Sequence, residues 1–261
     1  MQFWQSLILG IIEGVTEFLP ISSTFHLLFS TMLLRIPETD FVKFYSVFIQ
    51  GAAILSVVVL FFKEWLQDWK LLKNVVISFI PTAIVGLLLH KVIKNVFFAS
   101  PLLMIGAFAV TGLIFLILEV LVKQGRIKID KSLVEVTLIP AIIIGLCQAL
   151  AVLPGVSRAG AVMVAMMLMG YRRDEAAKYS FTLAIPTILG ASVFDLLDSR
   201  SVLLTATSND WIVLLIGCVA AFISALVITK WFIEFLRKHS LVPFAAYRLV
   251  LAAVLLVLMI V

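Results

Sequence analysis

The chain has 261 residues, of which 63% are hydrophobic and 13% are charged. Soluble domains average roughly 45–50% apolar and 25% charged residues, so this composition and the mean hydropathy of +1.18 exclude a soluble globular protein. The apolar runs are too long for barrel strands, which predicts an all-α polytopic membrane protein. The formal net charge of +5 comes from loop lysines and arginines, which report membrane orientation rather than nucleic-acid binding.

The first segment of the chain, 3–36, is apolar but is interrupted by a polar turn that begins at Pro20. The first basic residue is Arg35, so no cleavable signal peptide is expected. Glu13 and Glu17 precede the turn, and at a spacing of four on a helix both carboxylates share one face. Acidic side chains in hydrocarbon cost roughly several kcal/mol, and those that are kept usually have a function. We therefore expect this segment to contain catalytic or ligand-binding residues.

Apolar runs of spanning length make up much of the remaining chain. They cover about 41–62, 74–90, 101–122, 175–195, 211–229 and 243–261. Between the third and the fourth run lies a second interrupted segment, 133–170, whose turn begins at Pro154. A polar turn at membrane depth is tolerated only when it is buried in protein or lines a wet cavity. Both interrupted segments are therefore predicted to be re-entrant helical hairpins.

The two halves of the chain match at a constant offset of 134 residues. The matched pairs are Pro20 and Pro154, Ser23 and Ser157, Asp40 and Asp174, Tyr45 and Tyr179, and Ser46 and Ser180. This register predicts two repeats within one membrane domain, 1–132 and 133–261, each a hairpin followed by three spans. With three spans in each repeat, the second copy is inverted relative to the first.

The basic residues test this topology. If both hairpins are re-entrant, thirteen lysines and arginines fall on one side of the membrane, and five, Arg35, Lys43, Lys91, Lys94 and Arg200, fall on the other. The positive-inside bias then predicts that both termini and the entrance of the first hairpin lie outside, while the second hairpin enters from the cytoplasm. Arg248, near the cytoplasmic end of the last span, is expected to snorkel toward the interface.

The two turns are predicted to meet near the midplane and to form one anion site from two halves. The first half provides Glu13, Glu17, Ser22, Ser23, Thr24 and His26, and the second provides Gly155, Ser157 and Arg158. Each ascending helix directs backbone N–H groups and a positive dipole end inward, and at least one hydroxyl of the first turn is expected to cap its helix. Gly155 lets backbone approach a ligand closely, and the fork of Arg158 suits phosphate oxygens.

Two acids beside an anion site require a cation or a proton between them and the anion. Either a divalent metal bound by Glu13 and Glu17, or a carboxylate that acts as a base, meets this need. Ser23 or His26 is then the candidate nucleophile, activated by the other residue or by a glutamate. Phosphoryl transfer needs little beyond in-line positioning and charge neutralisation.

Two motifs resemble a known family. The run Glu13–Thr24 with His26, and the run Leu153–Arg158 with Gly160 and Ala161, resemble the signature motifs of the undecaprenyl-pyrophosphate phosphatase (bacitracin-resistance, UppP/BacA) family, and the likeness covers essentially the whole chain. The resemblance implies removal of one phosphate from a C55 isoprenyl diphosphate at the outer face of the bacterial plasma membrane. This reaction would recycle the lipid carrier for cell-wall synthesis, with Mg²⁺ or Ca²⁺ as the cation.

The same resemblance implies roles for individual residues. Glu13 and Glu17 would bind metal or move protons, and Ser23 would be the nucleophile. His26 would support it, and Arg158 would bind the diphosphate.

The sequence departs from the family pattern at three positions. Phe25 stands where a glycine is usual and is expected to place a bulky ring in the active turn, while Ala159 and Val162 replace a serine and a threonine beside the arginine. Two alternative functions stay open: an inverted-repeat transporter or polyprenyl-phosphate flippase, and a lipid-binding paralogue with weak turnover. The expected partners are the membrane and a polyprenyl diphosphate lipid, no nucleic acid is expected, and a homodimer is a further hypothesis.

Overall fold

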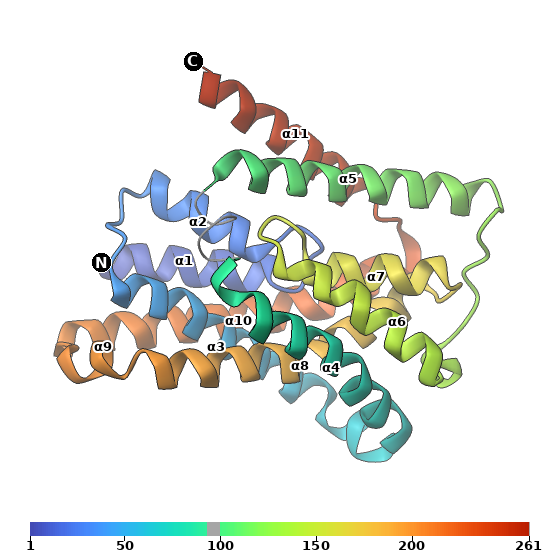
Figure 1. Ribbon diagram of the computed structural model, residues 1–261, viewed down its shortest axis with the longest axis horizontal. Coiled ribbons are helices and arrows are strands. Elements are labelled where there is room, and N and C mark those ends of the chain that lie inside the picture. The colour runs from blue at the N-terminus through green and yellow to red at the C-terminus, as the bar shows by residue number, and fades with distance from the viewer. Residues whose placement is uncertain (93–99, 261) are drawn as a thin grey trace.

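The computed structural model describes residues 1–92 and 100–260 of the chain (Figure 1). Lys94, one of the five basic residues predicted on the outer side, lies outside this description. The described part is helical, with one isolated parallel bridge between Lys131 and Tyr171. This architecture confirms the predicted all-α class.

Six described helices are long and apolar enough to cross a membrane. They are α3 (Asp40–Gln67), α4 (Trp69–Val92), α5 (Pro101–Lys123), α8 (Arg173–Asp198), α10 (Ser208–Lys238) and α11 (Val242–Ile260). Each coincides with a predicted apolar run, so the predicted number and order of long helices are confirmed.

The predicted ends of these helices are less accurate. Helix α10 continues to Lys238, so most of the segment between the predicted runs 211–229 and 243–261 is helical, and a short helix α9 (Arg200–Thr205) forms before α10. Hydropathy locates only the apolar part of a helix, whereas the backbone hydrogen bonds continue into its polar end. At the polar end of α10, Nη1 of Arg237 donates a hydrogen bond to Oε2 of Glu234 at 3.1 Å. The two residues are three positions apart and therefore lie on the same side of the helix.

Four shorter α-helices and two 3-10 helices form two helix–turn–helix units. The first unit comprises α1 (Phe3–Thr16) and α2 (Ser23–Leu33), and the second comprises η2 (Leu133–Glu135), α6 (Leu138–Ala149), η3 (Leu150–Val152) and α7 (Arg158–Leu168). A helix that spans the bilayer needs about 20 residues, and the longest of these, α1, has 14. In Figure 1 the first unit extends toward one end of the molecule and the second toward the other, with their turns between them.

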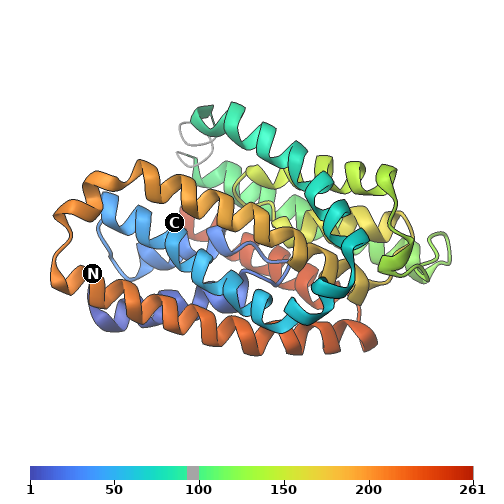
Figure 2. The ribbon, with the colours of Figure 1, turned by 90° about the horizontal axis from the view of Figure 1, so that it is seen from below.

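The two units lie between two layers of long helices. Helix α3 lies between α8 and α10 in one layer, as Figure 2 shows from below, and α5 packs against α11 on the opposite side (Figure 1). A separate apolar cluster of Phe25, Met104, Ile105, Phe108 and Ala252 joins α2 to α5 and α11. The turns are therefore enclosed from both sides.

Close backbone packing fixes the position of α1. A Cβ atom added to Gly10 would lie 2.5 Å from the carbonyl oxygen of Gly217, and one added to Gly14 would lie 2.3 Å from the carbonyl oxygen of Ala221. Glycines at this spacing let two membrane helices approach closely. The contact with α10 therefore sets the depth and rotation of the helix that carries the acidic residues.

Candidate functional site

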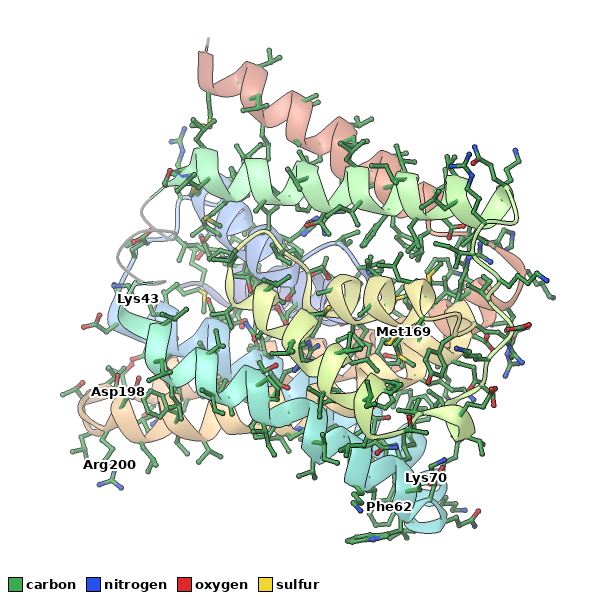
Figure 3. All side chains as sticks on the ribbon, turned by 45° about the vertical axis from the view of Figure 1, so that its right-hand side comes forward. Lys43, Phe62, Lys70, Met169, Asp198 and Arg200 are labelled. Carbon is green, nitrogen blue, oxygen red and sulfur yellow. The ribbon has the colours of Figure 1, made fainter. Side chains whose placement is uncertain are left out.

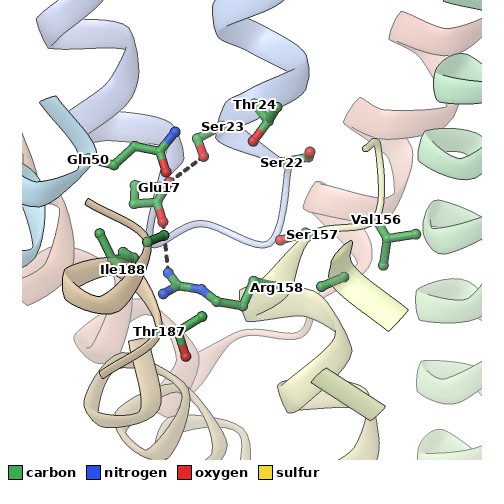
Figure 4. A pocket seen from close by; sticks show the side chains of 12 residues that line it. Glu17, Ser22, Ser23, Thr24, Gln50, Val156, Ser157, Arg158, Thr187 and Ile188 are labelled. Carbon is green, nitrogen blue, oxygen red and sulfur yellow. Dashed lines mark hydrogen bonds and ion pairs between the residues drawn. The ribbon is translucent and has the colours of Figure 1, made fainter. Parts of the chain in front are cut away.

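A cavity of about 160 Å³ lies where the two turns meet (Figure 4). Its lining comes from both helix–turn–helix units and from α3 and α8: Glu17, Ser22, Ser23, Thr24, Gln50, Ala151, Val156, Ser157, Arg158, Thr187, Ile188 and Ala191. The structure therefore brings together six of the predicted site residues from segments more than a hundred positions apart in the sequence. Predicted residues Glu13, His26 and Gly155 do not line it.

Glu17 connects the two halves of the site. The Ser23 hydroxyl donates a hydrogen bond to its Oε2 atom, and Nη2 of Arg158 donates to its Oε1 atom at 2.8 Å (Figure 4). Glu17 is only 9% exposed. Removing one partner from a buried ion pair costs about 3–5 kcal/mol, because the remaining charge stays buried.

Arg158 keeps further donors available. Its Nε and Nη1 atoms are buried and have no hydrogen-bond partner in the described part of the chain. Arg158 is also the first residue of α7, so the backbone N–H groups of that helix end lie beside its side chain. Buried donors without acceptors are costly, and both features favour an anion at this position.

The backbone of each turn is unusual in one place. Ser22 has a φ of 67°, which is uncommon for a residue other than glycine and costs about 1–2 kcal/mol. Gly155 has a φ of 95°, and a Cβ atom there would lie 2.3 Å from the carbonyl oxygen of Met104. Gly155 therefore lets the turn pack against α5. The sequence predicted that the backbone at Gly155 approaches a ligand closely, whereas in the structure it approaches the backbone of α5.

The two turns cap their helices differently. The Ser157 hydroxyl accepts a hydrogen bond from the backbone N–H of Gly160 at 3.1 Å and so caps α7. No side chain caps α2, although a hydroxyl of the first turn was predicted to do so. The N-cap residue is Ser22, whose backbone (φ 67°, ψ 92°) departs from the extended conformation that a capping residue usually has.

Glu13 differs from Glu17 in having no partner. It is completely buried, and neither carboxylate oxygen has a hydrogen-bond partner among the described residues. Two carboxylates and a hydroxyl are oxygen ligands of the kind that Mg²⁺ and Ca²⁺ prefer, so these residues fit such a cation. Residues 1–92 and 100–260 contain no group of three or more acidic, histidine or cysteine side chains suited to a metal. The protein would therefore supply only part of the coordination shell.

His26 is held away from the cavity. Its Nδ1 atom lies 2.8 Å from the carbonyl oxygen of Ser22, and its Nε2 atom lies 2.7 Å from the hydroxyl of Tyr247, whose ring stacks on the imidazole. Both ring nitrogens are therefore engaged by groups other than Ser23. Of the two candidate nucleophiles, only Ser23 is bonded to a group that can accept its proton.

Phe25 does not enter the active turn, which corrects the expectation from the sequence. Its ring is 1% exposed and stacks on Phe108 of α5, with ring centroids 4.0 Å apart. Because Phe25 follows Ser23 on α2, its side chain leaves the helix toward a different face. Ala159 and Val162 are buried in the interior.

Arg248 does not snorkel, and that prediction was wrong. Its side chain is completely buried and donates to the carbonyl oxygens of Phe108, Pro20 and Gly155. Position along a hydropathy profile places a residue near a helix end, but the direction of its side chain depends on which helices pack around it.

Sequence reasoning missed two polar residues of the cavity, Gln50 of α3 and Thr187 of α8. Both lie inside long apolar runs. A polar residue within such a run is a usable signal, because polar side chains in a membrane helix commonly face the protein interior. Nothing in the sequence indicated the contact between Tyr247 and His26, which joins the last helix to α2.

Known proteins are similar to this chain over almost its whole length. The family model described as bacitracin resistance protein BacA matches residues 6–254. A protein named undecaprenyl-diphosphatase from Aquifex aeolicus (strain VF5) is 41% identical over 254 residues, which cover 97% of each chain. A protein of the same name from Sulfurihydrogenibium sp. (strain YO3AOP1) is 43% identical over 95% of each chain. Another, from Campylobacter fetus subsp. fetus (strain 82-40), is 40% identical over 98% of this chain and 99% of its own. This chain therefore belongs to the bacitracin resistance protein BacA family.

Proposed function

We propose that this protein is an undecaprenyl-diphosphate phosphatase that releases inorganic phosphate and undecaprenyl phosphate. Family membership and the names of its relatives support the reaction. The observation that carries the proposal for this chain is the Glu17 bridge, which joins a serine hydroxyl to an arginine inside one buried cavity. A hydroxyl can act as the nucleophile of phosphoryl transfer, a carboxylate can accept its proton, and a guanidinium can neutralise the charge of the phosphate.

The proposed reaction starts at Ser23. Its Oγ atom forms a bond to the terminal phosphorus while the bond from that phosphorus to the bridging oxygen breaks, and the hydroxyl proton passes to Glu17. Glu17 gives this proton to the bridging oxygen as undecaprenyl phosphate leaves. Water then attacks the phosphorus of the phosphoserine while the bond from phosphorus to Oγ breaks, and Glu17 takes a proton from the water and returns it to Oγ. Inorganic phosphate is released and Ser23 is restored.

The second turn binds the diphosphate. The two unpartnered donors of Arg158 and the N-terminal N–H groups of α7 would contact the oxygens that carry negative charge in the transition state. Thr24 and Ser157 line the same cavity and add polar contacts. His26, bonded to Tyr247, fixes the carbonyl of Ser22 and so supports the shape of the first turn.

We further propose that a divalent cation, Mg²⁺ or Ca²⁺, is held by Glu13 with Glu17. The unpartnered buried carboxylate of Glu13 supports this assignment, because such a group needs a cation or a proton. When bound, the cation supplies neutralisation of charge on the diphosphate. Substrate oxygens and water would complete its coordination, as is usual for Mg²⁺.

We propose that the helix–turn–helix units are re-entrant and that 1–132 and 133–261 are inverted repeats. Two equivalent tyrosine contacts support the repeat. Tyr45 bonds Ser6, whose hydroxyl donates to the carbonyl of Val213, so α3 binds at the contact between α1 and α10. Tyr179 bonds Ser78, whose hydroxyl donates to the carbonyl of Ala141. Thus α8 binds at the contact between α6 and α4, although here the serine lies on the long helix and the carbonyl lies on the short one.

The proposed orientation places the cavity opening toward the outside of the plasma membrane. Lys43 and Arg200 lie at one end of the molecule and Lys70 at the other (Figure 3). This separation agrees with the predicted distribution of basic residues, in which the end with fewer of them is outside. An outward opening would suit a role in recycling the lipid carrier for cell-wall synthesis.

The test is phosphate release by the purified full-length protein, with undecaprenyl or farnesyl diphosphate and either Mg²⁺ or Ca²⁺. We expect turnover by the wild type and a loss of at least about a hundredfold in Glu17→Gln, because the proton acceptor is removed. Glu64→Gln, which changes an exposed glutamate, is the matched control and should keep full activity. Wild-type protein that releases no phosphate with either metal would overturn the proposal and favour a transporter or flippase.

A further inference from the structure

A single side chain from the last helix binds both turns of the site. Arg248 lies on α11 and is completely buried. Its Nη1 atom donates to the carbonyl oxygen of Pro20 at 3.0 Å, and its Nη2 atom donates to that of Gly155 at 2.7 Å. Its Nε atom donates to the carbonyl oxygen of Phe108 at 3.0 Å and so ties the guanidinium to α5.

The charge of Arg248 is stabilised without an acidic partner. No carboxylate in the described ranges, 1–92 and 100–260, forms an ion pair with it. Three carbonyl dipoles surround the guanidinium, and the ring centroids of Phe108 and Phe115 lie 4.2 Å and 5.7 Å from it. A buried cation is costly, and all of its hydrogen bonds here go to backbone. The interaction therefore fixes backbone position and neutralises no acid.

Each bonded carbonyl lies three residues before a group that bonds Glu17. Pro20 precedes Ser23 by three residues, and Gly155 precedes Arg158 by three residues. Ser23 and Arg158 are the two groups that bond Glu17. Since one rigid planar fork holds both carbonyls, it sets the distance between the turns and hence the geometry around Glu17.

We propose that Arg248 is a positioning residue that holds the two turns in the register required for phosphate transfer. This inference rests on the proposed function. Lysine keeps the positive charge but lacks the planar fork, so it cannot bond three separated carbonyls in the same arrangement. Arg248→Lys therefore separates the geometric role from a purely electrostatic one.

The experiment measures phosphate release by the full-length wild type, Arg248→Lys and the control Arg126→Lys, which changes an exposed loop arginine. Rates are expressed per folded protein, as determined by size-exclusion chromatography. Misplacement of reacting groups by about 1 Å lowers rates by about a hundredfold. We expect kcat of Arg248→Lys to fall by about that factor while KM stays within about threefold, and Arg126→Lys to match the wild type.

Each other outcome overturns the inference. A wild-type kcat per folded molecule in both Arg248→Lys and Arg248→Gln would mean that Arg248 acts only in folding. An increase in KM alone would mean that it only assists binding. Retention of wild-type kcat in Arg248→Lys together with its loss in Arg248→Gln would show that charge alone suffices. If the wild type itself releases no phosphate, the proposed function fails first, and this result is distinct from a defect confined to the variants.

Discussion

The first turn, between α1 and α2, contributes a carboxylate and a hydroxyl to the cavity, whereas the second turn, before α7, contributes a guanidinium. Even the matched serines differ, because Ser23 donates to Glu17 while Ser157 caps its own helix. Charges of opposite sign are thus divided between the two halves of the chain. Neither turn forms the site alone, so the site exists only when both halves are packed together.

Removing the charge of the second turn should have the largest effect. Arg158→Ala leaves Glu17 buried with only Ser23 as a partner. We expect a loss of about 3–5 kcal/mol in the free energy of unfolding and a loss of phosphate release of at least about a hundredfold. Arg158→Lys should recover much of the stability and little of the activity, because lysine lacks the bidentate fork.

Arg237→Ala provides the matched control for this prediction. Arg237 also forms an ion pair, but its side chain is 51% exposed, and exposed pairs contribute about 0–1 kcal/mol. Thermal unfolding and phosphate release should be measured on all three variants. If Arg158→Ala loses no more stability than Arg237→Ala, the bridge between the two turns does not hold the halves together.

A smaller effect is expected within the first turn, where Glu13 has no partner and Glu17 has two. Glu13→Gln removes a buried acid whose oxygens have no hydrogen-bond partner among the described residues, so the free energy of unfolding should not fall. Activity should instead require at least about tenfold more Mg²⁺ or Ca²⁺, because a ligand is lost. The measurement is the metal concentration that gives half-maximal phosphate release, with Glu64→Gln as the control.

An unchanged metal requirement in Glu13→Gln would contradict the assigned cation site. If the pH profile of phosphate release shifted at the same time, the carboxylate would instead serve to hold a proton. A large loss of stability in Glu13→Gln would show that the acid supports packing. Glu13 and Glu17 would then differ in their packing and not in their roles toward a cation.

The sequence predicted the chemical groups of the site better than their surroundings. Charged and hydroxyl residues in hydrocarbon are rare enough to stand out, so Glu17, Ser23 and Arg158 could be identified, and the repeat register brought the two turns together. Side-chain direction could not be predicted, since it depends on helix packing. Phe25 therefore turned out to face α5, and Arg248 to face the turns. Helix ends also differed, because hydropathy does not detect a helix that continues into polar residues such as Lys238.

The smallest expected effect concerns the backbone of the first turn. Ser22 adopts a φ of 67°, a conformation that glycine reaches without the steric cost that a Cβ atom imposes. Ser22→Gly and Ser22→Ala both remove the hydroxyl, so only the backbone differs between them. We expect the glycine variant to be more stable than the alanine variant by about 1 kcal/mol, which corresponds to about 2–4 °C in the midpoint of thermal unfolding. Equal midpoints would show that the first turn stores no strain at Ser22. The two turns would then differ in their charged groups but not in the energy of their backbones.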